Sequence, residues 1–163
     1  MVAIVEAEGG AQLDRVRALF RAYAREFGPA IEPTLDVQGF EAEVAALPGK
    51  YARPSGRLLM AVDQGRPAGC VAMRPLGDGD VEMKRLYVAP ESRGSGLGRR
   101  LVEAIVAEAR AAGYARICLD SLPVMARAIA LYRDCGFVEV PPYWPSPVET
   151  VYMARELRPP DGD

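Results

Sequence analysis

The sequence predicts a mixed α/β fold, in which a mostly antiparallel sheet carries helices on both faces. Segments with an apolar period near that of a helix alternate with short β-like segments. One helical segment separates two apolar strands, which is the pattern of a right-handed βαβ unit with parallel strands. We expect the other strands, several of which are joined by short turns, to pair antiparallel.

The first half of the chain predicts two helices and three strands. Apolar side chains recur at helical spacing in both helical segments, and Gly-Pro or Pro-Gly pairs end them. A tight turn joins the second and third strands. In order, we expect a strand at Val2–Glu6, helices at Ala11–Phe27 and Phe40–Leu47, and strands at Arg57–Asp63 and Ala68–Arg74.

The second half predicts the βαβ unit and its continuation. The strand Ala115–Asp120 has an apolar centre, which is consistent with burial on both faces. The other expected elements are a strand at Val81–Val88, helices at Leu97–Ala112 and Val124–Cys135, a strand from Gly136 to about Val140, a proline-rich loop at Pro141–Pro147 and a strand at Glu149–Arg155. Residues 1–158 make one domain in this interpretation, and residues 159–163 form a frayed tail.

The composition of the chain argues against several classes of function. The formal net charge of −2 argues against general nucleic-acid binding, which needs a clustered basic surface. The three cysteines are odd in number and form no CxxC pair, which favours reduced thiols in a cytoplasmic protein. The N-terminus lacks the pattern of a signal peptide, and no apolar run approaches the ~18 residues of a membrane span.

The chain contains no histidine. This excludes the Ser–His–Asp and Cys–His mechanisms and the common histidine-containing zinc sites. We therefore expect no metal. If the protein is an enzyme, then carboxylates, tyrosine, cysteine, lysine, water or the substrate itself must carry its proton transfers.

The most informative stretch is the glycine-rich loop between the strand Val81–Val88 and the following helix. Arg93 is followed by glycines at alternate positions, and the loop opens directly into the helix at Leu97. Backbone N–H groups at a helix N-terminus, with no side chains in the way, form a seat for phosphate or pyrophosphate.

Two common phosphate-binding motifs do not fit this loop. A Walker A motif would place Lys-Ser or Lys-Thr after Gly98, where Arg99 and Arg100 stand instead. The dinucleotide fingerprint would follow the first strand and would have different glycine spacing. A plain turn and helix start remains the alternative interpretation of a bare glycine triplet.

Three stretches together carry a more specific pattern. Arg93–Gly98 fits the pyrophosphate motif R/Q-x-x-G-x-G/A, and Leu86–Pro90 reads LYVAP just before it. Further on, Ala128–Phe137 reads AIALYRDCGF, which fits A-I-x-L-Y-x-x-x-G-F. In order and spacing these stretches resemble the GNAT acyltransferase superfamily, and the element order matches that family from about Val2 to Arg155.

The resemblance implies a fold that binds acetyl-CoA between the splayed strands Val81–Val88 and Ala115–Asp120, with a bulge in the first of them. Main-chain groups of the first strand would contact the pantetheine arm, and loop amides would hold the pyrophosphate. The implied cofactor-binding residues are Leu86, Tyr87, Val88, Arg93, Gly94, Ser95, Gly96, Leu97, Gly98 and Arg99. For Arg99 and Arg100, binding of ribose-phosphate oxygens and a solvated helix face both stay open.

The resemblance also assigns two catalytic residues. Glu82 stands where several family members carry the base that deprotonates the amine; the alternative is a surface carboxylate paired with Lys84 or an arginine. Tyr132 would protonate the departing thiolate, because a phenol is protonated at neutral pH. Its alternative is a core aromatic.

One position departs from the family pattern. Met125 stands where many members carry an asparagine that contacts CoA. Ser121 or backbone groups would then have to compensate for that contact.

We expect Gly28–Val37 and the loop that contains Tyr143 and Trp144 to line the acceptor site. The aromatic pair equally well caps the sheet. Glu32 and Asp36 carry charges that would attract a cationic amine.

The function expected from these observations is transfer of an acetyl group from acetyl-CoA to a primary amine of a small molecule or peptide, directly within a ternary complex. An amino acid, a polyamine, an aminoglycoside-like drug and a protein N-terminus all stay open as acceptors. A homodimer is compatible with the sequence. The rival interpretations are a catalytically silent CoA-binding regulatory module and a different phosphate-binding enzyme.

Overall fold

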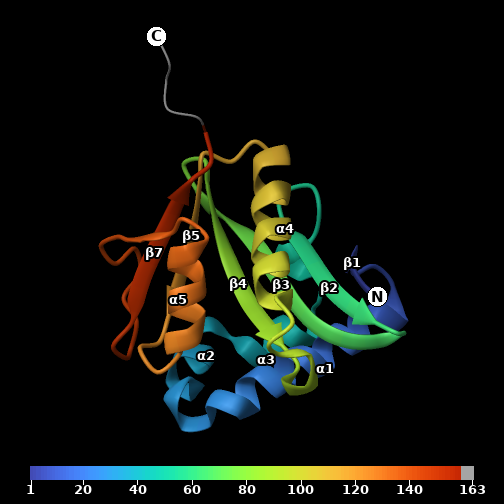
Figure 1. The fold of residues 1–163 in the computed structure, drawn as a ribbon. Helices are drawn as coiled ribbons and strands as arrows, with labels where there is room; N and C mark the ends of the chain where they lie inside the picture. The colour runs from blue at the N-terminus through green and yellow to red at the C-terminus, as the bar shows by residue number, and fades with distance from the viewer. Residues whose placement is uncertain (159–163) are drawn as a thin grey trace.

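The computed structural model describes residues 1–158 and contains a seven-stranded sheet in the order β1-β2-β3-β4-β5-β7-β6 (Figure 1). Strands β4 and β5 are parallel, and the other neighbouring pairs are antiparallel, which confirms the mixed sheet. The expected tail at 159–163 lies outside the described residues. The strands are β1 (Val2–Glu6), β2 (Arg57–Asp63), β3 (Arg66–Gly77), β4 (Asp80–Val88), β5 (Arg116–Ser121), β6 (Val138–Glu139) and β7 (Val151–Glu156).

The helices agree with those predicted from the sequence, except that the structure contains one more, α2. They are α1 (Gly10–Phe27), α2 (Glu32–Gln38), α3 (Phe40–Ala45), α4 (Leu97–Ala111) and α5 (Ala126–Asp134). The sequence prediction treated the region of α2 as a connection. Pro33 stands in the first turn of α2, and Gly39 ends it with a left-handed φ of 70°. Two turns of helix are too short to display a clear apolar period, which is why this helix was missed.

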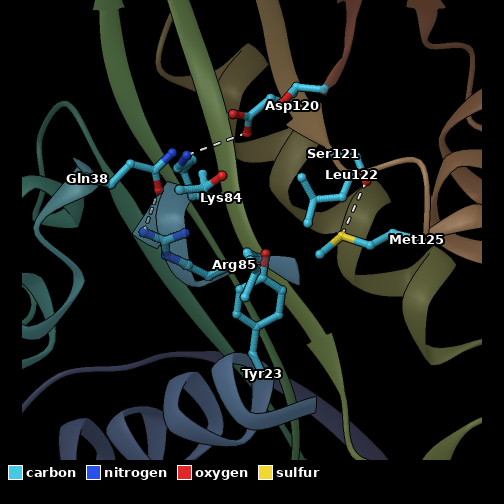
Figure 2. A pocket seen from close by; sticks show the side chains of 11 residues that line it. Tyr23, Gln38, Lys84, Arg85, Asp120, Ser121, Leu122 and Met125 are labelled. Atoms are coloured by element: carbon cyan, nitrogen blue, oxygen red, sulfur yellow. Dashed lines mark hydrogen bonds and ion pairs between the residues drawn. The ribbon is translucent and has the colours of Figure 1, made fainter. Parts of the chain in front are cut away.

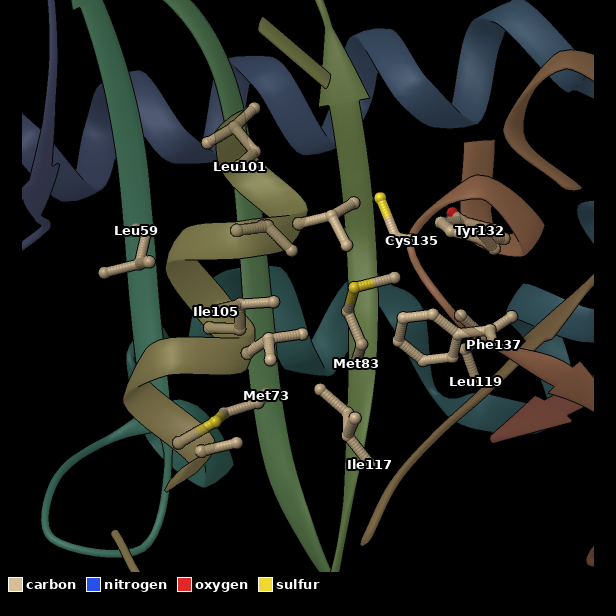
Figure 3. Packing of buried hydrophobic residues seen from close by; sticks show 14 of the residues in the cluster. Leu59, Met73, Met83, Leu101, Ile105, Ile117, Leu119, Tyr132, Cys135 and Phe137 are labelled. Carbon is tan, nitrogen blue, oxygen red and sulfur yellow. The ribbon is translucent and has the colours of Figure 1, made fainter. Parts of the chain in front are cut away.

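The sheet separates two apolar cores, and alternate residues of each strand enter alternate cores. Leu59 and Ala61 of β2 pack with α4 and α5, whereas Leu58 and Met60 pack with α1, α2 and α3. Figure 3 shows the first core, with side chains of α4 facing those of β3, β4 and β5. Helices therefore cover both faces of the sheet, as the sequence predicts.

The three cysteines, Cys70, Cys118 and Cys135, are all buried and unpaired. Burial raises the pKa of the Cys118 thiol to about 11, which leaves it protonated at neutral pH. Core packing is their role in this fold.

Strand β4 carries a bulge. Cys70 of β3 pairs with Tyr87 of β4, but Ala72 pairs with Lys84, so one residue of β3 stands opposite Arg85 and Leu86 together. Arg85 takes a left-handed φ of 61°, which is uncommon for a residue with a side chain. Such a bulge bends a strand and redirects its side chains.

Strands β4 and β5 separate partway along their length. Their pairing covers three positions and ends where Glu82 of β4 meets Cys118 of β5. Beyond that point β4 continues to Val88 beside β3, and β5 continues to Ser121 beside β7. The splay expected from the family resemblance is therefore present, and it opens toward the glycine loop.

Candidate active site

The glycine-rich loop leads into α4 with its backbone groups free of side-chain caps. Gly94 and Gly96 have φ values of 83° and 81°, a conformation that favours glycine, and Gly96 is the N-cap residue. No side-chain hydrogen bond caps the helix. The N–H groups of the first turn are thus available to an anion, and the helix dipole favours negative charge there.

Arg93 fastens this loop to its surroundings. Its Nε donates to the carbonyl of Val88 at 3.0 Å, and its Nη2 lies 2.7 Å from a carboxylate oxygen of Glu26. The guanidinium also lies over the ring of Tyr87. Arg93 therefore orients the loop against β4 and α1.

A groove of about 670 Å³ runs from this loop along the end of β4 to α5. This volume falls within the usual range for a cofactor site. It collects nine of the ten cofactor-binding residues expected from the sequence: Leu86, Tyr87, Val88, Arg93, Gly94, Gly96, Leu97, Gly98 and Arg99. Ser95 does not line the groove, and its hydroxyl donates to the carbonyl of Ser92 at 2.6 Å. Met125 lies in the wall at the start of α5.

A smaller cavity of about 70 Å³ continues from this groove into the gap between β4 and β5. Leu86, Met125 and Ala128 line both spaces, so the two adjoin. Tyr132 and Asp120 line the gap but not the groove. The gap is therefore where a group bound in the groove would meet polar side chains of the sheet.

Tyr132 combines features of both interpretations given to it. Its ring packs in the apolar core, 6.0 Å from that of Phe137, and Figure 3 shows the two side by side. The same side chain lines the gap between the strands. Burial raises the pKa of its phenol well above the ordinary value, so the hydroxyl keeps its proton at neutral pH and can act as a donor.

Glu82 lies at the fork where β4 and β5 separate, and its side chain is only 1% exposed. It is not the surface carboxylate of the alternative interpretation, although it has the ion pairs which that interpretation foresaw. Its carboxylate accepts hydrogen bonds from Arg74 Nε at 3.0 Å and from the hydroxyl of Tyr143 at 2.5 Å. Lys84 Nζ lies 3.7 Å away. Glu82 is not among the residues that line the gap, so any proton reaches it through an intermediary.

Asp120 is the residue that the sequence analysis missed. It lies on β5 beyond the end of the β4 pairing, and its Oδ2 accepts a hydrogen bond from Trp144 Nε1 at 2.7 Å. Its Oδ1 lies 3.6 Å from Lys84 Nζ. A carboxylate at the end of an otherwise apolar strand is unusual and was the signal available in the sequence.

The two aromatic residues of the proline-rich loop hold the buried carboxylates in place. Tyr143 donates to Glu82, and Trp144 donates to Asp120. Neither aromatic side chain is part of the cavity walls described here. Through these bonds they lie against β4 and β5, which are internal strands of the sheet, as the capping alternative expects.

A third cavity, of about 20 Å³, lies next to the gap and beneath α2 (Figure 2). Lys84, Arg85 and Asp120 line both spaces, whereas Thr34 and Gln38 line only this one. The Gly28–Val37 segment thus contributes Ile31 and Thr34 to the walls. Glu32 and Asp36 instead line a separate surface groove of about 470 Å³ on the helices.

Arg85, which lines this cavity, is hydrogen-bonded to two other side chains of the protein. Its Nε donates to Glu43 at 2.9 Å, and its Nη2 donates to Gln38 at 3.0 Å. Burial alone would raise the pKa of Glu43, but hydrogen bonds from Arg85 and Lys50 outweigh it and lower the pKa to about 2. Arg85 therefore has an ion-pair partner within the protein, Glu43, which also pairs with Lys50.

Within the described residues, no group of three or more cysteine, aspartate or glutamate side chains could hold a metal ion. In the same part of the chain, no helix has the length and apolar character needed to cross a membrane.

Comparison with known proteins agrees with this architecture. The sequence profile of the acetyltransferase (GNAT) family matches residues 15–137. An uncharacterized N-acetyltransferase of Schizosaccharomyces pombe is 40% identical over 148 residues, which are 89% of this chain and 88% of that protein. An "IAA acetyltransferase" of Azospirillum brasilense is 40% identical over 110 residues, covering 65% of this chain and 71% of its own.

Solved structures show the same fold. A putative acyl-CoA N-acyltransferase of Klebsiella pneumoniae is 29% identical with a TM-score of 0.71, and the match covers 97% of this chain and 99% of the other. A GNAT acetyltransferase of Staphylococcus aureus has a TM-score of 0.81 at 15% identity, covering 97% of this chain and 100% of the other. A Thermoplasma acidophilum N-acetyltransferase solved with coenzyme A has a TM-score of 0.75 at 13% identity, with coverages of 96% and 99%. With its glycine loop, splayed strands and profile match, this chain belongs to the acetyltransferase (GNAT) family and is an acyltransferase that uses acetyl-CoA.

Proposed function

We propose that this enzyme transfers the acetyl group of acetyl-CoA to a primary amine of a small molecule or peptide, directly within a ternary complex. The observation that supports this most is the continuity of three spaces. The groove at the glycine loop adjoins the gap between β4 and β5, and the gap adjoins the polar cavity beneath α2. A thioester entering from one side and an amine entering from the other would meet in the gap.

Direct transfer is supported by the state of the cysteines. An acyl-enzyme route needs an accessible thiolate, and burial raises the pKa of Cys118 to about 11 and that of Cys70 still further. Cys135 is also buried. Reduced cysteines favour a cytoplasmic location for the enzyme. The homodimer stays a prediction.

Glu82 and Tyr132 are the proposed base and acid. Glu82 takes up the proton that leaves the ammonium group before attack, through a water or through Lys84, since its carboxylate does not line the gap. The amine nitrogen then forms the new C–N bond and the C–S bond breaks. Tyr132 donates a proton to the departing sulfur and regains one from the acylated nitrogen, so that one proton is released in total.

The test is release of free thiol from acetyl-CoA across a panel of amines, with mass spectrometry of the acetylated product. Initial-rate plots that intersect support a ternary complex, and parallel plots contradict it. If the protein is a catalytically silent module, acetyl-CoA should bind to it and raise its melting temperature, but no amine should cause release of thiol. Stabilisation by ATP or NAD but not by CoA would contradict the assignment altogether.

A further inference from the structure

Two polar groups in the small cavity beneath α2 are poorly matched: the Lys84 ammonium has only two long ion pairs, and the Thr34 hydroxyl has no hydrogen-bond partner within residues 1–158. We propose that the acceptor is a free amino acid, whose carboxylate binds Lys84 and Thr34 while its amino group faces Asp120. This inference rests on the proposed function above, and it names the acceptor that the proposed function leaves open.

The first unmatched group is the ammonium of Lys84. Its side chain is 5% exposed, and its nearest carboxylate oxygens lie 3.6 Å away on Asp120 and 3.7 Å away on Glu82. Both distances exceed the 2.7–3.2 Å of a good N–H···O hydrogen bond. Figure 2 shows Lys84 at the cavity between Gln38 and Asp120. The ammonium is therefore held only by two long ion pairs, and a bound carboxylate would satisfy its N–H donors better.

The second unmatched group is the hydroxyl of Thr34. Thr34 is 7% exposed and lines this cavity from α2, and its Oγ1 has no hydrogen-bond partner within residues 1–158. A buried hydroxyl without a partner is destabilising, so its presence calls for an explanation. A bound carboxylate oxygen would accept its hydrogen bond.

The charges around the cavity suit a zwitterion. Arg85 is ion-paired with Glu43, and Lys84 lies between two carboxylates at long distances, 3.6 Å from Asp120 and 3.7 Å from Glu82. A zwitterion brings its carboxylate to Lys84 and its ammonium to Asp120, so that every buried charge gains a partner. An amine without a carboxylate would take Asp120 and leave the Lys84 ammonium with less compensation, which is costly in a buried site.

The same arrangement orients the acceptor for reaction. Asp120 lines both the small cavity and the gap, Tyr132 lines only the gap, and Thr34 lines only the small cavity. Lys84 lines both spaces, so an amino group at Asp120 would face Tyr132 while the carboxylate reaches from Lys84 toward Thr34 on the far side. The small cavity, at about 20 Å³, has room for a terminal group of about one water's size rather than for a continuing chain.

The experiment compares free L-amino acids with their carboxamides as acceptors, using thiol release to obtain kcat/KM for each pair. The amide keeps the amino group and the side chain but removes the negative charge. We expect the free acids to be favoured by about 10- to 100-fold, the range expected for charge-assisted hydrogen bonds. Lys84→Met should abolish that preference, whereas Lys50→Met, at the chain's other lysine, should retain it.

Thr34→Val supplies an independent readout, because it removes the unpartnered hydroxyl without changing the shape of the side chain. We expect the free protein to melt at a higher temperature, while the preference for acid over amide falls several-fold. Thr150→Val is the matched control, since Thr150 lines the same cavity but its hydroxyl already bonds to Ser146 and Val148. That variant should keep the preference.

Equal kcat/KM for acids and amides, or better turnover of peptides, would overturn the inference and leave acetyl transfer itself intact. So would a Thr34→Val protein that is more stable yet keeps the full preference. If no amine released thiol, the proposed function would fail instead. Melting temperatures in the presence of CoA would then decide the inference. Free amino acids should raise the melting temperature of the protein and their amides should not, and Lys84→Met should lose this stabilisation.

Discussion

Lys84 Nζ and Asp120 Oδ1 face each other across 3.6 Å at the place where β4 and β5 have just separated. In a continuous parallel sheet these strands would be bridged by backbone hydrogen bonds at this level. Here the backbones have parted, and side chains line the space between them. The charged pair thus marks the point where the sheet opens into the gap, and Glu82 lies 3.7 Å from Lys84 Nζ.

Replacing Tyr132 by phenylalanine should lower kcat by about 10²–10⁴-fold, the usual contribution of general acid catalysis. The fold should persist, because the ring keeps its contact with Phe137. Steady-state kinetics and melting curves measure the two effects. Tyr114→Phe is the control, as Tyr114 bonds to Ser55 outside the site. An unchanged kcat in Tyr132→Phe would remove the residue from the mechanism.

Glu82→Gln should also lower kcat by about 10²–10⁴-fold, because the amide cannot take up the proton of the substrate. Some loss of stability accompanies it, since Arg74 and Lys84 lose a buried negative partner. Glu32→Gln provides the comparison, as Glu32 lines the separate surface groove. Kinetics of both variants at saturating acetyl-CoA should separate them; similar rates would contradict the role of Glu82.

Gly96→Ala should weaken acetyl-CoA binding and destabilise the protein by about 1–2 kcal/mol, because alanine is strained at a φ of 81°. Gly113 stands at the other end of α4 with a φ of 88°. Gly113→Ala should therefore cost similar stability and leave the affinity for acetyl-CoA unchanged. Calorimetric titration with acetyl-CoA distinguishes the two, and equal affinities in both variants would contradict an anion site at the loop.

Stability should fall in acid because of Glu43. Its pKa is about 2 in the folded protein against 4.5 for the free side chain, since hydrogen bonds from Arg85 and Lys50 outweigh the effect of burial. A carboxyl with a lowered folded pKa stabilises the protein fully above pH 4.5 and loses that contribution as the pH falls through 2. The span corresponds to about 3 kcal/mol.

Urea unfolding from pH 6 down to pH 2 measures this dependence. Glu43→Gln should be less stable than the wild type at neutral pH, because Arg85 loses its buried partner, and its slope with pH should be shallower. Parallel curves for the two proteins would show that other carboxyl groups dominate the acid response.

Much of the fold follows from local patterns. The helices α1 and α4 display a full apolar period, and the strand pairs joined by tight turns leave little choice of partner. The glycine loop was recognisable because its conformation depends on Gly94 and Gly96 themselves. The short helix α2 was missed because its seven residues present too little periodicity.

One part of the candidate site could likewise be predicted from local sequence patterns, and another part could not. Its cofactor side lies in one continuous stretch from Leu86 to Arg99, with α5 packed beside it, so sequence motifs describe it well. Its acceptor side combines Thr34, Lys84 and Asp120 from three separate elements. Nothing in the neighbourhood of any one of them signals the other two.

The order of the elements, the glycine loop and the family can all be recognised in the amino-acid sequence, because each depends on residues close together along the chain. Three relationships become visible in the folded protein alone: β4 and β5 separate after Glu82, the Glu82 carboxylate is buried 3.7 Å from Lys84 Nζ, and Asp120 and Thr34 share a cavity. These relationships depend on a bulge at Arg85 and on packing across the sheet, where contacts between distant segments override local preference.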